Sequence, residues 1–296
     1  MKILIIKPGA LGDTILIFDL LKNLCAHKFD VTFVGNADYI NLIPYFDLGK
    51  SLSFDDRFFL PLFVEKAGES VLDEQLVDFF NSFSYVILIY HKLTDFYHKI
   101  ERLYRRKLIY LKTLPDYLIP LRLYYTKEIL GFLDLPVLYK YYHIKHIPQG
   151  KAIIIHPGSG SKEKIWNLEN FIKLCKFLLQ KNQNLVLIEG PAERGIFKHF
   201  SSFNHHPKVK FERINSLSQF IKIISYSTFY IGNDSGLTHL ASFMGISGIA
   251  IFGKTNPWLW CPIPNIPAIY ENKEDGIDFP SIEFVCEFLE NYIDFI

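Results

Sequence analysis

The sequence begins with KILIIKPGALGD at residues 2–13, a short apolar run that leads directly into a loop of small residues. A second stretch of the same kind, AIIIHPGSGSKEK, occupies residues 152–164. Such runs are typical of strands that are buried on both faces of a parallel sheet. After the first loop, which contains Gly9 and Gly12, leucines recur at helical spacing over residues 16–24. Each stretch therefore predicts the first strand, loop and helix of an α/β domain.

The same alternation of β-branched runs and amphipathic stretches continues on both sides of a break at residues 139–150. The break is rich in Tyr, His and Lys and contains Pro148 and Gly150, which is typical of a linker. Strands are predicted at residues 2–6, 31–34, 51–54, 85–90, 108–111, 152–155, 185–188, 209–211, 229–231 and 248–252. The predicted fold class is α/β, with two doubly wound domains.

The domains are predicted at residues 1–145 and 151–280, followed by a helix within 281–296. In that helix the apolar residues Val285, Cys286, Leu289, Ile293 and Ile296 share one face, and Glu283, Glu287, Glu290 and Asp294 share the other. We expect the apolar face to dock on the protein, either across both domains or back on the first. The acidic face argues against a helix lying on a membrane surface.

Composition excludes several classes of protein. Of the 296 residues 49% are hydrophobic and 21% are charged, which is typical of folded globular domains and not of disordered chains. The 32 basic and 31 acidic residues leave a net charge of +1, so no overall field attracts nucleic acid. The N-terminal apolar run is too short for a signal peptide, and no run predicts a spanning helix. We therefore expect a cytoplasmic protein.

The four cysteines, Cys25, Cys175, Cys261 and Cys286, lie far apart and form no CxxC pair. This spacing favours reduced thiols and argues against a zinc site or a disulfide framework. We expect neither a metal nor a cofactor.

The loop at residues 7–14 is the first candidate for chemistry, because ligands of doubly wound sheets bind beyond the carboxyl ends of the strands. It has neither the GxGxxG pattern of a dinucleotide site nor the GKS/T ending of a P-loop. It does place the carboxylate of Asp13 at the start of a helix. Two interpretations stand: Asp13 caps the helix, or it serves as a general base.

Three further loops follow predicted strands of the second half. Residues 156–166 carry small residues and lysines that suit a phosphate, although a solvated Gly/Ser turn explains them equally well. Residues 230–241, YIGNDSGLTHLA, end a strand near Ile231 and begin a helix near Ser235, so the first helix amides form a second anion site. Residues 252–262 contain two tryptophans, which either rim a ligand site or pack beneath the loop.

Taken together, these four loops resemble bacterial glycosyltransferase family nine, the lipopolysaccharide heptosyltransferases. The resemblance rests on KPGALGD at 7–13, KIW at 164–166, DSGLTHL at 234–240 and FGKTNPW at 252–258, in the same order as in the family. It covers essentially the whole chain, and the DSGLTH element is its most specific part. Lys254 and Asn256 depart from the Pro and Asp that are common in the family, so the last loop is expected to meet the donor differently.

The resemblance implies a GT-B fold, in which two Rossmann-like domains face each other across a cleft. It implies transfer of a heptose from ADP-heptose, with inversion and without a required metal, to an anionic lipid-linked saccharide acceptor of the lipopolysaccharide core. Asp13 would be the general base, and Lys164 would offset charge on the departing ADP. The donor site would comprise Ser159, Gly160, Lys164, Glu193, Asp234, Ser235, Gly236, Leu237 and His239, with Glu193 near the ribose.

On the acceptor side we expect Lys7 and Gly12, together with Arg102, Arg105 and Arg106 from the basic segment at residues 92–127. The basic segment has three interpretations: contact with the acceptor, peripheral contact with the inner membrane, or a solvated helix face. Two alternative functions also stand. One is a GT-B transferase or epimerase that uses a UDP-sugar, and the other is a non-catalytic nucleotide-sugar-binding protein.

Overall fold

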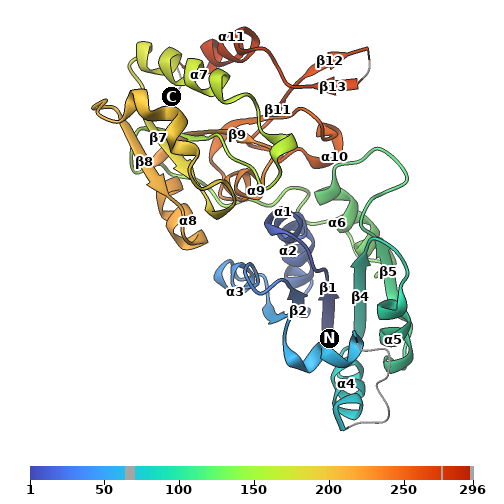
Figure 1. Cartoon of the computed structure of the whole chain (residues 1–296). Coiled ribbons are helices and arrows are strands. Elements are labelled where there is room, and N and C mark those ends of the chain that lie inside the picture. Colours follow the sequence, from blue (N-terminus) through green and yellow to red (C-terminus); the bar gives the residue numbers. More distant parts are fainter. Residues whose placement is uncertain (64–70, 275, 294–296) are drawn as a thin grey trace. The chain divides into compact units, whose positions relative to one another are not determined.

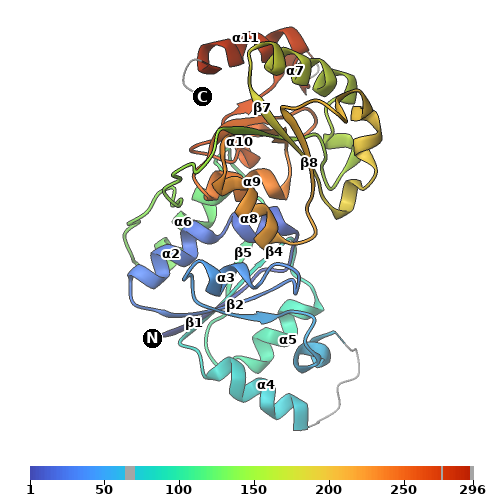
Figure 2. The same cartoon turned by 90° about the vertical axis from the view of Figure 1, so that its left-hand side faces the viewer.

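The computed structural model describes residues 1–63, 71–274 and 276–293. The chain divides into two compact units, Met1–Tyr142 and His143–Ile296. Each unit contains a parallel sheet covered by helices on both faces (Figures 1 and 2).

In the described part of the first unit, five parallel strands lie in the order β3-β2-β1-β4-β5. The strands are β1 (Lys2–Ile6), β2 (Asp30–Gly35), β3 (Lys50–Ser53), β4 (Tyr85–Tyr90) and β5 (Ile109–Lys112). The helices between them are α1 (Leu11–Ile15), α2 (Phe18–Ala26), α3 (Leu42–Tyr45), the 3₁₀ helix η1 (Arg57–Leu62), α4 (Val71–Asn81), α5 (Asp95–Leu103) and α6 (Leu121–Phe132). All predicted strands of this half are confirmed to within one residue at either end.

The central strand β1 is apolar on both faces because both faces are covered. Leu4 and Ile6 pack in one core cluster with Phe80 of α4 and Ile100 of α5. The residues that alternate with Leu4 and Ile6 along β1 are also fully buried, on the opposite face of the sheet. The helices α2 and α6 contact each other. Figure 2 shows the sheet of this unit with α2 on one side and α4 and α5 on the other.

Two predictions near the N-terminus need correction. The helix expected after the first loop is two helices, α1 and α2, and Gly12 lies inside α1 and not in the loop. Asp13 is also not the N-cap residue, since that position is taken by Ala10. The helix starts early because the Asp13 carboxylate accepts the Ala10 N–H at 3.2 Å and thereby closes the first turn over Gly12.

The first part of the predicted linker is anchored to the first unit by buried side chains. Asn23 accepts the N–H groups of Leu138 and Tyr139 at 2.7 and 3.0 Å. Asp19 accepts the N–H of Tyr142 at 2.7 Å, and Arg122 donates to the Tyr142 carbonyl at 2.7 Å. The composition of this segment indicated an irregular backbone correctly, and side chains of α2 and α6 bind its backbone groups at Leu138, Tyr139 and Tyr142.

In the second unit, the described residues form six parallel strands in the order β11-β10-β9-β6-β7-β8. They are β6 (Ala152–His156), β7 (Asn184–Glu189), β8 (Val209–Arg213), β9 (Ser227–Asn233), β10 (Ser247–Ile251) and β11 (Ala268–Ile269), and β12 (Glu271–Lys273) pairs with β13 (Gly276–Asp278). The helices are η2 (Lys162–Lys164), α7 (Leu168–Gln180), η3 (Pro191–Glu193), η4 (Ile196–Phe203), α8 (Leu217–Ser225), α9 (Gly236–Phe243), α10 (Pro257–Trp260) and α11 (Ile282–Ile293). The predicted strands from β6 to β10 are confirmed, while β11 to β13 were not predicted.

The C-terminal helix α11 packs against α7. Its residues Val285 and Leu289 are fully buried in the same cluster as Leu174 and Leu178. The apolar face seen in the sequence is therefore occupied within the second unit. Predicted contributions of residues 294–296 lie outside the described residues.

Candidate functional site

The first group of polar side chains lies at the carboxyl end of β1. The ammonium group of Lys7 lies 3.1 Å from Oδ1 of Asp13, and Oδ2 accepts the Ala10 N–H. Lys7 is 2% exposed and Asp13 is 27% exposed. The structure therefore brings together two predicted residues and presents one of them, the Asp13 carboxylate, to solvent.

The surroundings of Lys7 are apolar and aromatic. Burial lowers the pKa of Lys7, and the charge and hydrogen bond of Asp13 offset part of that effect. The ammonium lies 5.4 Å from the ring centroid of Tyr125, whose hydroxyl donates to the Thr113 carbonyl. Burial and the Asp13 charge raise the pKa of Tyr125. Lys7 is thus enclosed by protein and holds Oδ1 of Asp13 from its buried side.

The predicted acceptor-binding arginines do not lie with Lys7, Gly12 and Asp13. Arg102 is in the last turn of α5, and its Nε donates to the His98 carbonyl. The Arg105 N–H donates to Asn81, and the Arg106 guanidinium donates to the Phe83 carbonyl. Phe83 precedes β4 and these arginines precede β5, so they lie at the amino end of a sheet whose carboxyl end holds Asp13.

The second group of polar side chains lies at the carboxyl ends of β6 and β9 and is organised by Asn233. Its Oδ1 accepts the Trp166 N–H at 3.0 Å, and its Nδ2 donates to the carbonyls of Pro157 and Gly158 at 2.9 and 3.2 Å. Asn233 is fully buried and thus joins the loop after β6 to the end of β9. Its role was not predicted; only its place between a strand and the DSGLTH element hinted at it.

Asp234 positions the predicted phosphate ligand Lys164. Its Oδ2 accepts from the Lys164 ammonium at 2.7 Å and from the Thr255 hydroxyl at 2.8 Å, and its carbonyl accepts from Ser159 at 2.9 Å. Asp234 is 4% exposed and Lys164 is 30% exposed. The ammonium of Lys164 also lies 5.7 Å from the Trp260 ring. The buried Asp234 carboxylate therefore holds the partly exposed Lys164 ammonium at the carboxyl edge of the sheet.

The N-terminus of α9 lies next to this pair. Ser235 is its N-cap, and its Oγ accepts the Thr238 N–H at 3.3 Å. Helix geometry leaves the amides of Gly236 and Leu237 without intrahelical acceptors. His239 is buried, with its Nε2 3.9 Å from Oδ1 of Asp234. Amide dipoles and the Lys164 ammonium thus meet at one edge, an arrangement that suits an anion.

Glu193 lies at the end of the η3 turn and pairs with His156, which was not predicted. Its Oε1 lies 2.7 Å from Nε2 of His156 and accepts the Gly190 N–H at 2.8 Å. Burial raises the pKa of Glu193, but the hydrogen bond and charge of His156, together with backbone N–H donors such as that of Gly190, leave the pKa below its ordinary value. A Cβ on Gly158 would lie 2.3 Å from Cγ of Glu193, whereas Gly160 faces open space.

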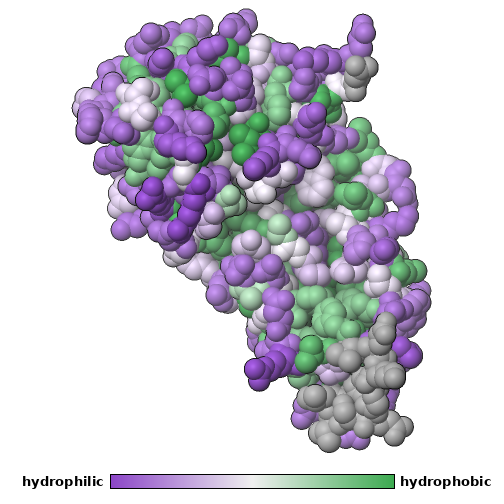
Figure 3. Space-filling view, viewed as in Figure 1, coloured by the Kyte–Doolittle hydropathy of each residue, from purple (hydrophilic) through white to green (hydrophobic). Residues whose placement is uncertain are grey.

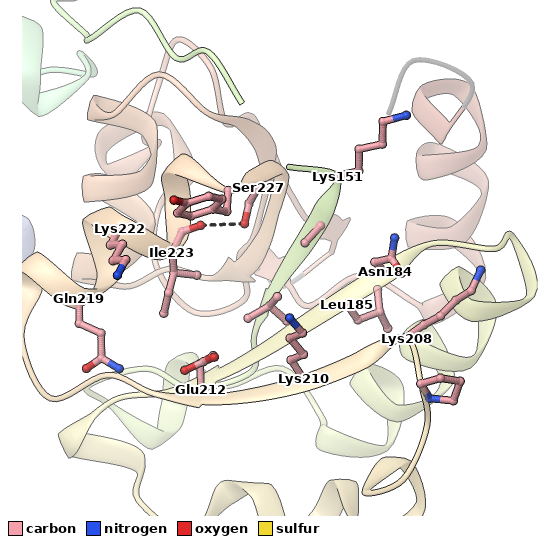
Figure 4. Close-up of a pocket in the computed structure, with 14 residues that line it drawn as sticks. Lys151, Asn184, Leu185, Lys208, Lys210, Glu212, Gln219, Lys222, Ile223 and Ser227 are labelled. Atoms are coloured by element: carbon pink, nitrogen blue, oxygen red, sulfur yellow. Dashed lines mark hydrogen bonds between the residues drawn. The ribbon is translucent and has the colours of Figure 1, made fainter. Parts of the chain in front are cut away.

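A separate groove of about 580 Å³ lies near the amino ends of β6, β7, β8 and β9 (Figure 4). Lys210 and Glu212 of β8 and Gln219 and Lys222 of α8 line it. The connection from β8 to β9 crosses β7 and β6. Its helix α8 has only nine residues and leaves part of that face of the sheet uncovered, which forms the groove. It is not part of the Asp234 and Glu193 cluster.

In the described part of the chain, no three His, Cys, Asp or Glu side chains are close enough to hold a metal ion together. No helix among those residues has the length and apolar character to cross a bilayer.

Comparison with known proteins agrees with the geometry. Residues 134–278 match the family model of glycosyltransferase family 9 (heptosyltransferase). The lipopolysaccharide core heptosyltransferase OpsX of Haemophilus influenzae is 27% identical over 45% of this chain, and the match spans 40% of OpsX. The lipooligosaccharide heptosyltransferase 2 of Campylobacter jejuni is 24% identical over 87% of this chain and 84% of its own length.

Solved structures show the same fold over nearly the whole chain. E. coli heptosyltransferase WaaC with ADP superposes with a TM-score of 0.74 at 14% identity, covering 98% of this chain and 99% of WaaC. A glycosyltransferase family 9 structure from Veillonella parvula gives 0.76 at 15% identity, covering 99% of this chain and 97% of its own. The two α/β units thus have the GT-B fold of these structures, and the chain is similar in sequence to glycosyltransferase family 9, the heptosyltransferase family, whose model matches residues 134–278.

Proposed function

We propose that this protein transfers a heptose from ADP-heptose to a saccharide acceptor of the lipopolysaccharide core, with inversion and without a metal. The observation that carries the proposal is the Asp234 cluster, where a buried carboxylate presents Lys164 beside the N-terminus of α9. This cluster lies within the residues that match the heptosyltransferase family model. The comparison with WaaC, a heptosyltransferase with ADP, supports ADP as the nucleotide.

On the donor side, Lys164 and the amides of Gly236 and Leu237 would bind the diphosphate. As the bond to the sugar breaks, negative charge grows on the departing ADP, and fixed cationic and dipolar groups stabilise it more than they stabilise the bound donor. A lysine and a helix N-terminus supply this stabilisation without a divalent ion. Glu193 would accept a hydrogen bond from a ribose hydroxyl.

On the acceptor side, Asp13 would take the proton of the attacking hydroxyl. A general base must be exposed to its substrate and held in place, and Asp13 meets both conditions. Its carboxylate is partly exposed, while the Ala10 amide and the buried Lys7 fix its orientation. Direct displacement by an acceptor activated in this way inverts the anomeric centre.

A lipid-linked acceptor is supported by exposed apolar residues on the loop between β5 and α6. Leu114, Tyr117 and Leu118 lie on that loop, at the same sheet edge as Asp13, and hydrophobic side chains are visible at the surface there (Figure 3). We expect the double substitution Leu114→Ser and Leu118→Ser to raise KM for a lipid-linked acceptor about tenfold and to leave KM for its delipidated form unchanged. Equal effects on both acceptors would remove the lipid from the proposal.

Donor identity is tested by calorimetric titration with ADP and UDP, each with and without EDTA. We expect ADP to bind more tightly than UDP and EDTA to have no effect on the ADP affinity. Tighter binding of UDP would favour a transferase or epimerase that uses a UDP-sugar. ADP binding without turnover of ADP-heptose by any tested acceptor would favour a non-catalytic nucleotide-sugar-binding protein.

A further inference from the structure

Beneath the candidate donor site lies a buried chain of hydrogen bonds centred on His156. This residue is at the carboxyl end of β6, between β7 and β9, and is 2% exposed. Its Nε2 lies 2.7 Å from Oε1 of Glu193, and its Nδ1 lies 3.0 Å from the Tyr230 hydroxyl and 3.5 Å from Oγ of Ser235. The imidazole thus contacts the turn that follows β7, the strand β9 and the N-cap residue of α9.

The protons of the three hydroxyl groups in this chain can be assigned by counting. Oγ1 of Thr238 lies 2.5 Å from the Asn233 carbonyl, which can only accept, so the single Thr238 hydroxyl proton is used there. Tyr230 and Ser235 lie 3.1 and 3.0 Å from the same Oγ1, so a hydrogen bond at each of these contacts requires Tyr230 and Ser235 to donate their own protons to it. No hydroxyl proton then remains to point toward His156.

This count of hydroxyl protons determines which ring nitrogens of His156 carry a proton. Nδ1 faces the oxygens of Tyr230 and Ser235, whose protons are directed elsewhere, so Nδ1 must carry a proton and donate. On the other side, the ionised Glu193 carboxylate has no proton to give, so Nε2 must donate to Oε1, which also accepts the Gly190 N–H. A neutral ring has one N–H and would leave two lone pairs facing each other in the interior.

We infer that His156 is a buried imidazolium, ion-paired with Glu193, and that it is a positioning residue for the donor site. Only the positioning role rests on the proposed function; the protonation state of His156 does not. By holding Oε1, the ring orients the Glu193 carboxylate and leaves Oε2 toward a ligand hydroxyl. It also places a positive charge beside Ser235, at the end of α9 where the diphosphate is proposed to bind.

The other ionisable groups of these loops are committed to their own partners. Asp234 binds Lys164 and lies 3.9 Å from His239, and Glu189 pairs with Arg213. The pKa of the Tyr230 hydroxyl is raised by burial, so this residue stays neutral and acts as an acceptor for the ring. Among the described residues, Glu193 is the anion in hydrogen-bond contact with His156.

The protonation state is tested by NMR of the ¹⁵N-labelled full chain at pH 7.5 without ligand, with His156 assigned by its absence in His156→Gln. Exposed histidines have a pKa of about 6.5 and are mostly neutral at that pH. We expect both ring nitrogens of His156 to show imidazolium shifts, and Glu193→Gln to convert them to a neutral pattern. A neutral pattern in the unmodified protein, or unchanged shifts in Glu193→Gln, would overturn the inference. This outcome does not depend on whether ADP binds.

The positioning role is tested by the ADP dissociation constant as a function of pH. In the unmodified protein we expect no change between pH 6 and 8. In Glu193→Gln we expect ADP binding to weaken about tenfold at pH 8 and to recover in part at pH 6, where the ring regains its proton. His146→Gln is the matched control, because His146 bonds to the Ser227 carbonyl, and its profile should be flat. A flat profile in Glu193→Gln would contradict the positioning role.

Discussion

At the scale of single residues, Lys164, the partly exposed cation of the proposed donor site, is held by the buried carboxylate of Asp234. We expect Lys164→Ala to weaken ADP binding about 10- to 100-fold, because a hydrogen bond to a charged group contributes roughly 1.5–3 kcal/mol. Asp234→Asn should weaken it less, since the lysine charge remains but its orientation is lost. Titration calorimetry measures both. Lys162→Ala is the control, because Lys162 is exposed in the same short helix. Equal losses for Lys162 and Lys164 would show that only overall charge matters.

The ion pair of Glu193 predicts how stability depends on pH. Because the folded state lowers the pKa of Glu193 from 4.5, the ionised carboxylate stabilises the fold above pH 4.5. That contribution is lost as the pH falls through the lowered pKa. We therefore expect Glu193→Gln to reduce the free energy of unfolding at pH 7 and to have a smaller effect at pH 3. Urea titrations at both values measure the difference, and an equal loss at both would exclude an electrostatic origin.

At the scale of elements, the loop after β6 contains two glycines, one without space for a Cβ atom and one with ample space for it. A methyl group on Gly158 would collide with the Glu193 side chain, which His156 and the Gly190 amide hold in place. Gly160 has no neighbour within 4 Å of an added Cβ. We expect Gly158→Ala to lower the thermal midpoint by several degrees and Gly160→Ala to leave it nearly unchanged, as scanning calorimetry would show. Equal midpoints would indicate that Glu193 moves aside freely.

Elements that are buried on both faces could be predicted, and elements defined by pairing alone could not. β1, β6 and β9 are apolar runs between turn residues, and Ser235 caps α9 where the strand-to-helix transition was expected. β11 has two residues, too few for any periodicity, and it exists because it pairs with β10. The break between α1 and α2 was missed because apolar spacing continues across it.

At the scale of the whole molecule, the segment between the units is held by a buried ion pair. Asp19 accepts from Arg122 at 2.6 and 2.8 Å, and both side chains are almost fully buried. We expect Arg122→Met to cost about 3–5 kcal/mol of unfolding free energy, because it leaves Asp19 buried without its cation. Lys50→Met, which breaks an exposed pair with Asp30, should cost no more than about 1 kcal/mol. Denaturant unfolding compares them, and similar costs would contradict this account.

The alternation of strands and helices predicted two α/β units, and four loop motifs predicted the family. The sequence could not show that His156 meets Glu193, because that contact depends on the strand order β7-β6-β9. It also could not place Arg102, Arg105 and Arg106, because a basic helix face looks the same at either end of a sheet. Lys7 and Asp13 were singled out because both follow the first strand closely in the sequence, and the structure brings them together at the carboxyl end of β1.

The most direct test of the proposed function is heptosyl transfer by the unmodified protein and by Asp13→Asn. Each is incubated with ADP-heptose and a lipopolysaccharide-core acceptor, and the acceptor mass and released ADP are followed over time. We predict one added heptose per acceptor with the unmodified protein. For Asp13→Asn we predict a rate at least about 100-fold lower with ADP affinity within twofold, as loss of a general base requires. Transfer by Asp13→Asn at a rate close to that of the unmodified protein would contradict the assignment of Asp13 as the base.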